Sequence, residues 1–356
     1  MRILITGNMG YVGPLVAAEL RRTRPGAVLV GADTGYFAHC LTGAGTLPER
    51  LLDVQHFADV RTLPDEALQG VDAVVQLAAI SNDPIGNRYE DTTDAINHVA
   101  AVDVARRAKA AGARSFVFAS SCSVYGSADD APRTESSELA PLTAYARSKV
   151  ATEEDTLALA DDDFTVTCLR FSTACGMSPR LRLDLVLNDF VACALSTGTI
   201  SILSDGTPWR PLIHVRDMAR AVDWAIDRPQ DAGGAHLTVN VGSDDWNVQV
   251  RPLAEAVAAV VPGVDISVNP DAPPDKRSYR VDFSLFRRLA PDHQPQVDLE
   301  RAIAEIAAGL RAMGFADPDF RGSQLMRLNV LERLRGEGLL DGGLAWTGAA
   351  PVLAAG

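Results

Sequence analysis

A tyrosine and a lysine four residues apart are the first side chains whose types and spacing could do chemistry. They are Tyr145 and Lys149, in the stretch Y-A-R-S-K. Residues at this spacing lie on one face of a helix. A tyrosine hydroxyl, with a reference pKa of about 10, is a poor base at neutral pH, but a neighbouring ammonium stabilises the phenolate. The pair predicts a general base supported by a cation. The alternative is an exposed helix whose tyrosine is half buried.

Further hydroxyl groups gather upstream, in S-S-C-S-V-Y-G at 120–126. This stretch follows the apolar run S-F-V-F-A, so its serines, cysteine and tyrosine stand at the end of a predicted strand. The stretch by itself does not say which hydroxyl works beside the predicted base.

A glycine-rich turn between the first predicted strand and the first predicted helix indicates a dinucleotide site. In T-G-N-M-G-Y-V-G, at 6–13, Gly7 permits the tight turn, Gly10 lets the backbone approach a pyrophosphate, and Gly13 allows close helix–strand packing. The helix N-terminus then offers N–H groups and a positive dipole end to the phosphates. The alternative is a purely structural turn.

An acid at the end of the second predicted strand specifies the cofactor. Asp33 follows Gly13 by 20 residues, and its carboxylate can accept hydrogen bonds from a ribose diol. The same carboxylate would repel a 2′-phosphate, and residues 31–37 include no basic side chain to receive one. The expected cofactor is therefore NAD.

The elements that must position these residues alternate between short apolar runs and longer helical patterns. Strands are expected at 2–6, 27–32, 73–78, 115–120 and 165–171, and helices near 11–22, 90–112 and 145–160. Apolar strands separated by helices predict a parallel sheet covered on both faces. The predicted fold class is α/β, a Rossmann-type doubly wound parallel sheet with a smaller, mixed C-terminal substrate-binding portion. We expect residues 1–172 to form the NAD-binding domain and residues 173–356 to form mostly the substrate-binding portion, with segments near 212–226 and 236–243 returning to the main sheet.

Composition and charge exclude several classes of protein. The formal net charge of −13, from 33 basic and 46 acidic side chains, disfavours nucleic acid as a partner because nothing offsets phosphate repulsion. The scattered cysteines lack metal-ligand spacing, so we expect reduced thiols in a cytoplasmic protein, and no metal site. The N-terminus meets glycines too early for a signal peptide or a membrane span, so no membrane partner is expected. His214 is expected to be a buried polar residue satisfied by backbone groups.

Taken in order, the motifs resemble the extended short-chain dehydrogenase/reductase family, specifically its NAD-dependent nucleotide-sugar epimerases and dehydratases. The resemblance runs from residue 1 to about 290 and rests on T-G-x-x-G-x-x-G, Q-L-A-A (76–79), S-S-C-S-V-Y-G, Y-x-x-x-K, L-R-F (169–171) and W-R-P-L-I-H-V (209–215). It implies that Ser121 holds the substrate oxygen beside Tyr145. It also implies cofactor contacts from Asn8, Met9, Tyr11 and Val12 in the glycine loop, Asp59 and Val60 at the adenine, Leu77, Ala78 and Ala79 along the dinucleotide, Tyr145 and Lys149, and Asn97 on a helix beneath the active site. Gln76 departs from the histidine that many relatives carry, a change we expect to be tolerated.

The resemblance further implies that the substrate is a nucleotide-diphosphate sugar. Arg210, in P-W-R-P, and Arg277, in D-K-R-S-Y-R, match positions where the family clamps the diphosphate, and Asn188 resembles a diphosphate-contacting asparagine. The predicted substrate contacts are completed by Ser81, Ser123 and Thr173, the last of which stands where many relatives have an asparagine. Arg180 and Arg182 add positive charge nearby without an assigned place. For each arginine the alternative is an ordinary surface charge.

The two residues after Ser121 narrow the reaction. Relatives that eliminate water carry Asp-Glu, or a lone Glu, where this chain has Cys122 and Ser123, and decarboxylases carry an acid at the second position. The 3,5-epimerases and keto-sugar reductases have a cysteine at the position of Ser123, whereas here the cysteine comes one residue earlier. In an extended segment that shift points the thiol the other way.

The remaining chemistry is 4-epimerisation through a transient 4-keto sugar, with hydride held on tightly bound NAD. The alternatives are a sugar-nucleotide oxidoreductase such as a keto-sugar reductase, a 3,5-epimerase or dehydratase of the same family, and a non-catalytic NAD-binding sensor. Related proteins pair the helices equivalent to 90–112 and 145–160 across a two-fold axis, so a homodimer is expected. The segment from about 297 to 343 lies beyond the resemblance and has no assigned role.

Overall fold

The computed structural model describes residues 1–43, 45–127, 131–269 and 278–348. Over these residues, seven parallel strands form the main sheet in the order β10-β6-β5-β4-β1-β2-β3. Their bounds are β1 (Arg2–Thr6), β2 (Val28–Asp33), β3 (Val54–Phe57), β4 (Ala73–Gln76), β5 (Ser115–Ser121), β6 (Thr165–Phe171) and β10 (His236–Val241). The order in which successive strands are added to the sheet reverses between β1 and β4, which is where open parallel sheets bind their ligands. The predicted Rossmann-type fold is confirmed.

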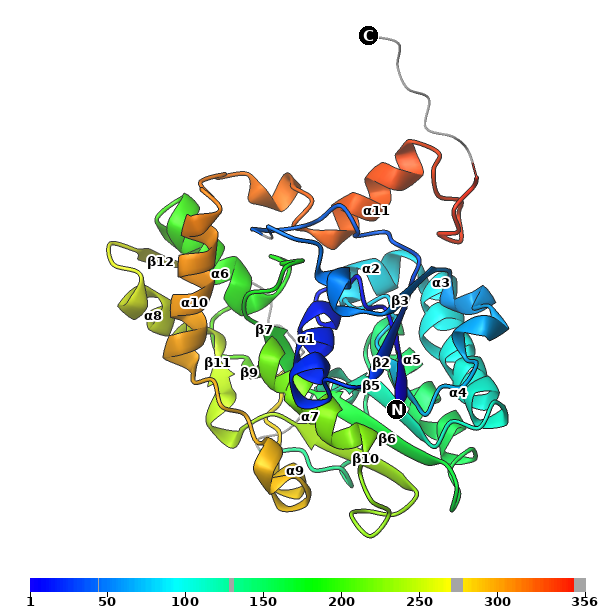
Figure 1. Ribbon diagram of the computed structural model, residues 1–356. Helices are drawn as coiled ribbons and strands as arrows, with labels where there is room; N and C mark the ends of the chain where they lie inside the picture. The colour runs from blue at the N-terminus through cyan, green and yellow to red at the C-terminus, as the bar shows by residue number, and fades with distance from the viewer. Residues whose placement is uncertain (44, 128–130, 270–277, 349–356) are drawn as a thin grey trace, which may run out of the picture.

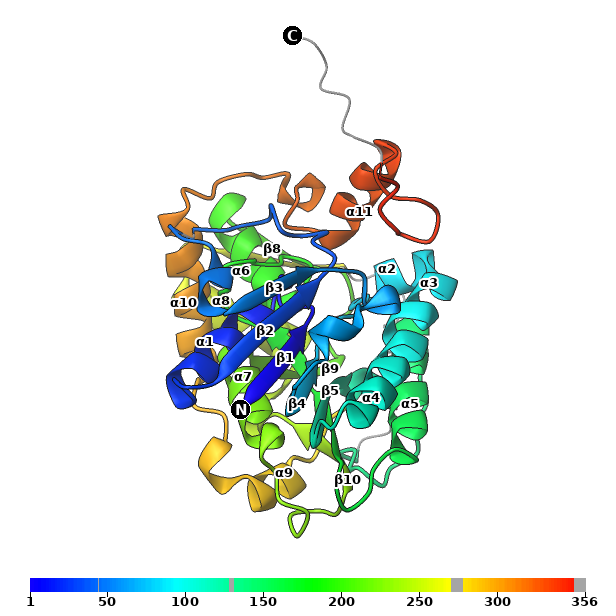
Figure 2. The same ribbon diagram turned by 45° about the vertical axis from the view of Figure 1, so that its right-hand side comes forward.

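Helices cover both faces of this sheet because successive residues of a strand point to opposite sides. The helices are α1 (Gly13–Thr23), α2 (Asp83–Arg88), α3 (Glu90–Asp94), α4 (Ala100–Ala110), α5 (Ala144–Leu157), α6 (Val186–Ser196), α7 (Val215–Ile226), α8 (Val250–Val260), α9 (Ser284–Leu289), α10 (Leu299–Ala312) and α11 (Arg327–Gly336). Ile3 and Ile5 share a buried core with α1 and α7, whereas Leu4, between them, packs with α4 on the other face. Helix α5 lies beside α4, and Figures 1 and 2 show the two layers on either side of the sheet.

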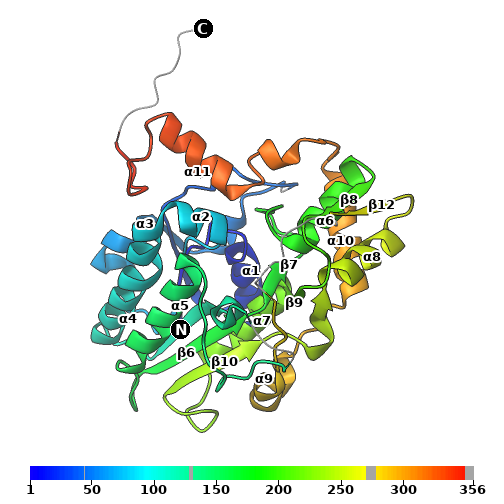
Figure 3. The same cartoon turned by 180° about the vertical axis from the view of Figure 1, so that it is seen from behind.

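The smaller portion is mixed. It contains a three-stranded sheet in the order β11-β9-β7 and a two-stranded sheet of β12 and β8. These strands are β7 (Thr173–Cys175), β8 (Thr199–Ile202), β9 (Trp209–His214), β11 (Asn247–Gln249) and β12 (Asp265–Val268). Helices α6, α8 and α10 pack against one another at this side of the molecule, as Figure 3 shows from behind.

Two details differ from the sequence-based expectation, and a third, the return of a segment near 236–243 to the main sheet, agrees with it. Strand β3 was not predicted. The long helix expected over 90–112 is divided into α3, a π-helical turn at Ala95–Val99 and α4. After the smaller portion begins, the chain returns to the main sheet as β10 beside β6. The division at residue 172 itself stays a prediction.

Candidate active site

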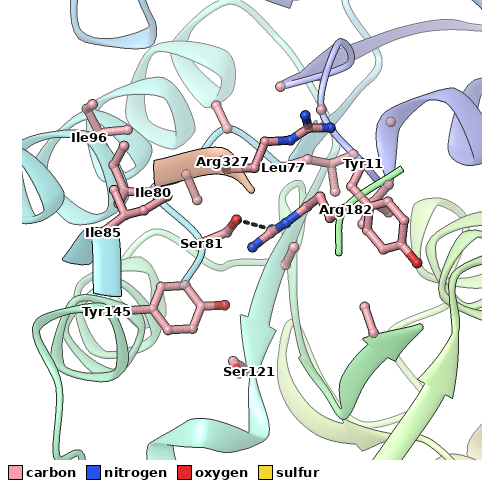
Figure 4. A pocket seen from close by; sticks show the side chains of 18 of the residues that line it. Tyr11, Leu77, Ile80, Ser81, Ile85, Ile96, Ser121, Tyr145, Arg182 and Arg327 are labelled. Carbon is pink, nitrogen blue, oxygen red and sulfur yellow. Dashed lines mark hydrogen bonds between the residues drawn. The ribbon is translucent and has the colours of Figure 1, made fainter. Parts of the chain in front are cut away.

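A pocket of about 300 Å³ lies at the carboxyl ends of the main strands. Figure 4 shows Tyr145, Ser121, Ser81, Arg182, Tyr11 and Arg327 converging on it from separate elements. Most residues predicted from the sequence line this single pocket. They are Gly7, Gly10, Tyr11, Val12, Gly13, Asp33, Asp59, Val60, Leu77, Ala78, Ala79, Ser81, Ser121, Ser123, Tyr145, Lys149 and Thr173.

The glycine loop has the geometry that a dinucleotide site requires. Gly7 has φ 70°, and a Cβ there would lie 2.6 Å from the backbone nitrogen of Ala78, so β1 and β4 approach closely only because this side chain is absent. A Cβ on Gly13 would lie 2.3 Å from the carbonyl oxygen of Asn8. No side chain caps the N-terminus of α1, so its first N–H groups remain available to an anion. The loop therefore fits the phosphates of NAD.

Asp33 and Asp59 lie at the β2 end of the pocket. The Asp33 carboxylate accepts hydrogen bonds from the backbone N–H groups of Met9 (2.9 Å) and Gly35 (2.7 Å), and burial raises the pKa of Asp33. Asp59 is paired with Arg61, with 2.5 Å between the carboxylate and the guanidinium. Both carboxylates face the space where the adenosine half of NAD is expected.

Helix α5 presents the predicted base. Thr143 caps the helix by accepting a hydrogen bond from the N–H of Ala146 (3.2 Å), and Tyr145 follows in the first turn. The Ser121 hydroxyl at the end of β5 is close enough to act on the Tyr145 hydroxyl, since hydrogen bonding by Ser121 lowers the pKa of Tyr145. The Lys149 ammonium lies 5.5 Å from the centre of the Tyr145 ring and donates to the carbonyl of Ala119 (2.8 Å). The helix and the strand end thus bring the three predicted catalytic residues together.

Without a bound cofactor, the protein does not favour a phenolate at Tyr145. Burial raises the pKa of Tyr145 to about 12, and the hydrogen bond from Ser121 opposes this only in part. Burial lowers the pKa of Lys149 to about 7, against which Glu153 acts in the opposite direction. In the chain by itself, desolvation disfavours the charged form of both groups, and the role of Lys149 in supporting a Tyr145 phenolate stays a prediction. The positive nicotinamide ring of bound NAD would supply the missing charge.

The depressed Lys149 pKa predicts a pH-dependent stability. Between pH 7 and pH 9 the unfolded chain holds a proton on Lys149, whose ordinary pKa is 10.5, while the folded protein loses it through about 7. Because the unfolded state binds more protons in this range, stability rises with pH. Urea unfolding of the cofactor-free protein should give a gain of about 2 kcal/mol from pH 7 to pH 9 relative to Lys149→Met, which has no such linkage. Equal pH slopes in the two proteins would contradict the assigned burial.

The other side chains of the serine-rich stretch point in different directions. Ser120 donates a hydrogen bond to the buried carboxylate of Glu153. The Cys122 thiol is buried and donates to the carbonyl of Arg170 (3.1 Å), and burial raises its pKa. Ser123 lines the pocket, and its buried oxygen has no hydrogen-bond partner among the described residues. The thiol turns away as predicted, but through a 3₁₀ turn at Cys122–Tyr125 and not through an extended segment.

Several predicted contacts do not line this pocket. Asn188 is fully buried, accepting from the Gly176 N–H (3.0 Å) and donating to the Arg182 carbonyl (2.8 Å), so its amide is committed to the framework. Asn97 lies beneath the site as expected, where it binds the backbone of Ile80 and donates to the Ser148 hydroxyl (3.1 Å). Asn8 and Met9, within the glycine loop, are also buried.

Of the two predicted diphosphate arginines, the described one falls outside this lining. Arg210 borders a smaller adjoining cavity that shares Ser123, Thr173 and Tyr279 with the main pocket. Arg277 lies outside the described residues.

His214 is buried, and its Nδ1 accepts from the Arg216 N–H (3.2 Å), but its Nε2 lies 3.6 Å from Glu305 without a hydrogen bond. The expectation that backbone groups satisfy His214 thus holds for one nitrogen only.

Some residues that complete the pocket were not predicted from the sequence or had no assigned place. Arg182 donates to the Ser81 hydroxyl (2.7 Å) and pairs with Asp184 (2.8 Å). Tyr279, Arg327 and Leu331 also line the pocket. The R-L-R stretch at 180–182 signalled only charge. Tyr279 lies in the D-K-R-S-Y-R stretch that was noted for its arginine alone, and no motif marked Arg327 or Leu331.

Comparisons with known proteins agree with this geometry. A model described as the NAD dependent epimerase/dehydratase family matches residues 3–242. The UDP-glucose 4-epimerase of Corynebacterium glutamicum is 28% identical over 267 residues, covering 69% of this chain and 76% of that protein. The dTDP-glucose 4,6-dehydratase of an Actinoplanes species is 28% identical over 334 residues, covering 88% and 98% respectively.

A solved structure, MoeE5 in complex with UDP-glucuronic acid and NAD, superposes with a TM-score of 0.74 at 25% identity, covering 87% of this chain and 99% of that one. An epimerase and a dehydratase match at the same identity, so the similarity does not choose between the reactions. Within the described part of the chain, no group of side chains is arranged to hold a metal ion, and no helix is long and apolar enough to cross a membrane.

Proposed function

This chain belongs to the NAD-dependent epimerase/dehydratase family, and from that premise we propose that it is a nucleotide-sugar 4-epimerase that keeps its NAD through the reaction. The observation that carries the proposal is the composition of the pocket around Tyr145. Ser121 and Lys149 adjoin this tyrosine, and the described residues that line the pocket there include no carboxylate.

The proposed chemistry needs one acid–base residue. Bound NAD supplies the hydride acceptor and donor. The Tyr145 oxygen takes the proton of the sugar 4-hydroxyl as the C4 hydride leaves. Ser121 holds the sugar oxygen by a hydrogen bond. After the 4-keto sugar turns in the site, Tyr145 returns the proton and the hydride adds to the other face of C4. No atom is gained or lost overall.

The position of the carboxylates disfavours elimination of water. Among the described lining residues, Asp33 and Asp59 carry carboxylates, and both lie at the β2 end. Asp83, at the start of α2, is close enough to raise the Tyr145 pKa, but it accepts a hydrogen bond from Thr143 (2.8 Å) and is not part of the pocket wall. A dehydratase or decarboxylase requires an acid beside the ketone, and Cys122 and Ser123 supply none.

The substrate proposed is a nucleotide-diphosphate sugar. Arg210 borders the cavity next to Ser123 and Thr173, so a sugar at Tyr145 would have a cation near its diphosphate. We also retain Arg277 as a diphosphate contact. Asn188 contributes through Arg182 and the Gly176 backbone instead of by direct contact. UDP-sugars are the first compounds to test, since similar proteins carry UDP-sugar names.

Mass spectrometry and NMR of the purified enzyme, without added cofactor, test the reaction. The expected result is interconversion of two UDP-sugars that differ at C4, with unchanged mass and no solvent deuterium on carbon in D₂O. Loss of water or of CO₂ from the sugar would establish a dehydratase or a decarboxylase. Deuterium at C3 or C5 would establish a 3,5-epimerase, and stoichiometric release of NADH would establish an oxidoreductase. NAD binding without any turnover would favour the alternative of a non-catalytic NAD-binding sensor.

We further propose that the enzyme acts in the cytoplasm as a homodimer. The described cysteines are all buried free thiols, as a reducing compartment allows. The surfaces of α4 and α5 are the proposed contact. At their edges, the apolar side chains of Val99 and Leu157 are each 57% exposed. Exposed apolar side chains of this kind favour contact with another protein surface. Light scattering of the protein measures the mass, and a monomer at micromolar concentration would contradict the dimer.

A further inference from the structure

The C-terminal segment, which had no assigned role, forms one wall of the pocket. We call residues 325–347 the C-terminal clasp; it consists of α11 and the hairpin that follows, in which Leu340 pairs with Trp346. Arg327 and Leu331 of α11 line the pocket itself. Figures 1 and 3 show the clasp as the orange-to-red segment above the carboxyl ends of the strands, next to α2.

The hairpin of the clasp is fastened to the β2 end of the pocket. The Trp346 indole N–H donates to the Thr34 carbonyl (2.7 Å), and its ring lies 5.9 Å from that of Tyr36. The Tyr36 hydroxyl donates to the Leu344 carbonyl, and Arg61 donates to the Gly343 carbonyl (2.7 Å). Thr34 and Tyr36 line the pocket beside Asp33. The hairpin thus holds the loop that carries the predicted ribose-binding acid.

Helix α11 is fastened on the opposite side, to α2. The Tyr89 hydroxyl donates to Glu332 (2.9 Å), and Val330, Leu331 and Leu334 share a buried apolar cluster with Ile85. The clasp therefore bridges the two sides of the pocket and does not lie on one of them.

Arg327 is a buried cation without an anionic partner. It is 2% exposed, and no carboxylate in the described part of the chain forms an ion pair with it. Its guanidinium donates to the carbonyls of Arg180 (2.9 Å) and Leu181 (3.1 Å) and stacks 4.9 Å from the centre of the Phe37 ring. Figure 4 shows its side chain reaching from α11 into the pocket beside Leu77.

The neighbouring arginines are neutralised within the protein. Arg180 pairs with Glu49 (2.6 Å) and Arg182 pairs with Asp184. Burying an unpaired charge is costly, so an unpaired guanidinium at the pocket wall, the only one among the described lining residues, indicates that an anion binds there. The NAD diphosphate has that charge, and the glycine loop that fits it lines the same cavity.

We propose that the C-terminal clasp retains NAD between turnovers by closing the β2 end of the pocket and by directing Arg327 toward the cofactor's diphosphate. A clasp fastened on both sides must open before NAD leaves, so its contribution appears mainly in the dissociation rate. This inference extends the proposed function, in which NAD stays bound.

Exchange of labelled NAD tests the clasp independently of activity. The full-length protein is loaded with radiolabelled NAD and chased with excess unlabelled NAD, and retained label is followed on filters. Arg327→Met and Trp346→Ala should each release NAD about tenfold faster or more. Arg311→Met, which removes an exposed arginine of α10, serves as the matched control and should release NAD at the wild-type rate.

Unchanged release from both clasp variants would overturn the proposal. So would a Trp346→Ala protein that raises the KM for the sugar nucleotide at an unchanged NAD release rate, since the segment would then guard the substrate. If Arg327→Met fails to fold, Trp346→Ala decides alone, because Trp346 is 46% exposed and its removal leaves the core intact. Faster release from variants of a protein with no epimerase activity would leave the clasp standing and reject the proposed function.

Discussion

Tyr145→Phe should lower kcat by about 10³-fold while the protein still binds NAD. The substitution removes the oxygen that we propose takes and returns the sugar proton, and it leaves the ring, the helix and the glycine loop in place. Because Tyr145 lies against Ser121 and not against the β2 end, the contacts to the adenosine half should persist. Turnover of the UDP-sugar pair and titration with NAD measure the two effects separately.

A second tyrosine provides the control for this assignment. Tyr279 lines the same pocket and is also largely buried, and burial raises its pKa as well. Tyr279→Phe is expected to change the KM for the sugar nucleotide more than kcat. If Tyr279→Phe abolished turnover and Tyr145→Phe did not, the base would be misassigned.

The second large effect concerns stability. Arg170→Met should lower the free energy of unfolding by about 3–5 kcal/mol, because it leaves the Glu153 carboxylate buried without its partner. The two side chains are each 5% exposed and lie 2.6 Å apart, joining α5 to β6. Ser120 extends the same network by donating a hydrogen bond to Glu153, and Tyr125 extends it by accepting one from Arg170 (3.0 Å).

A double-mutant cycle measured by urea unfolding separates the pair from its surroundings. Adding Glu153→Met to Arg170→Met should recover much of the loss, since two apolar side chains of similar size replace two charges. A double variant less stable than Arg170→Met would show that the network, not the isolated charge, dominates. Glu153 also lies one turn after Lys149, so removing it should lower the Lys149 pKa further.

Local patterns in the sequence were sufficient for the fold and for much of the pocket lining. The glycine spacing at 7, 10 and 13 depends on sterics within one turn, and the structure shows the same close approaches. The spacing of Tyr145 and Lys149 depends on helical periodicity alone. The strand at 165–171 has the predicted bounds because its residues are buried on both faces.

Contacts between distant segments were less predictable. Asn188 matched a family position, but the fold commits its amide to Gly176 and Arg182, which no local pattern indicates. The burial that raises the Tyr145 pKa was also not visible, because spacing shows which charges are close whereas desolvation depends on what covers the site.

The sequence by itself indicated the parallel sheet, the glycine loop, the spacing of Tyr145 and Lys149 and the absence of an acid directly after Ser121, because each depends on residues close together in the chain. Tertiary structure alone decided which arginines are neutralised and that Arg327 and Leu331 of α11 line the same pocket as Gly7. Burial and charge compensation depend on contacts between residues hundreds of positions apart, and those contacts exist only once the chain has folded.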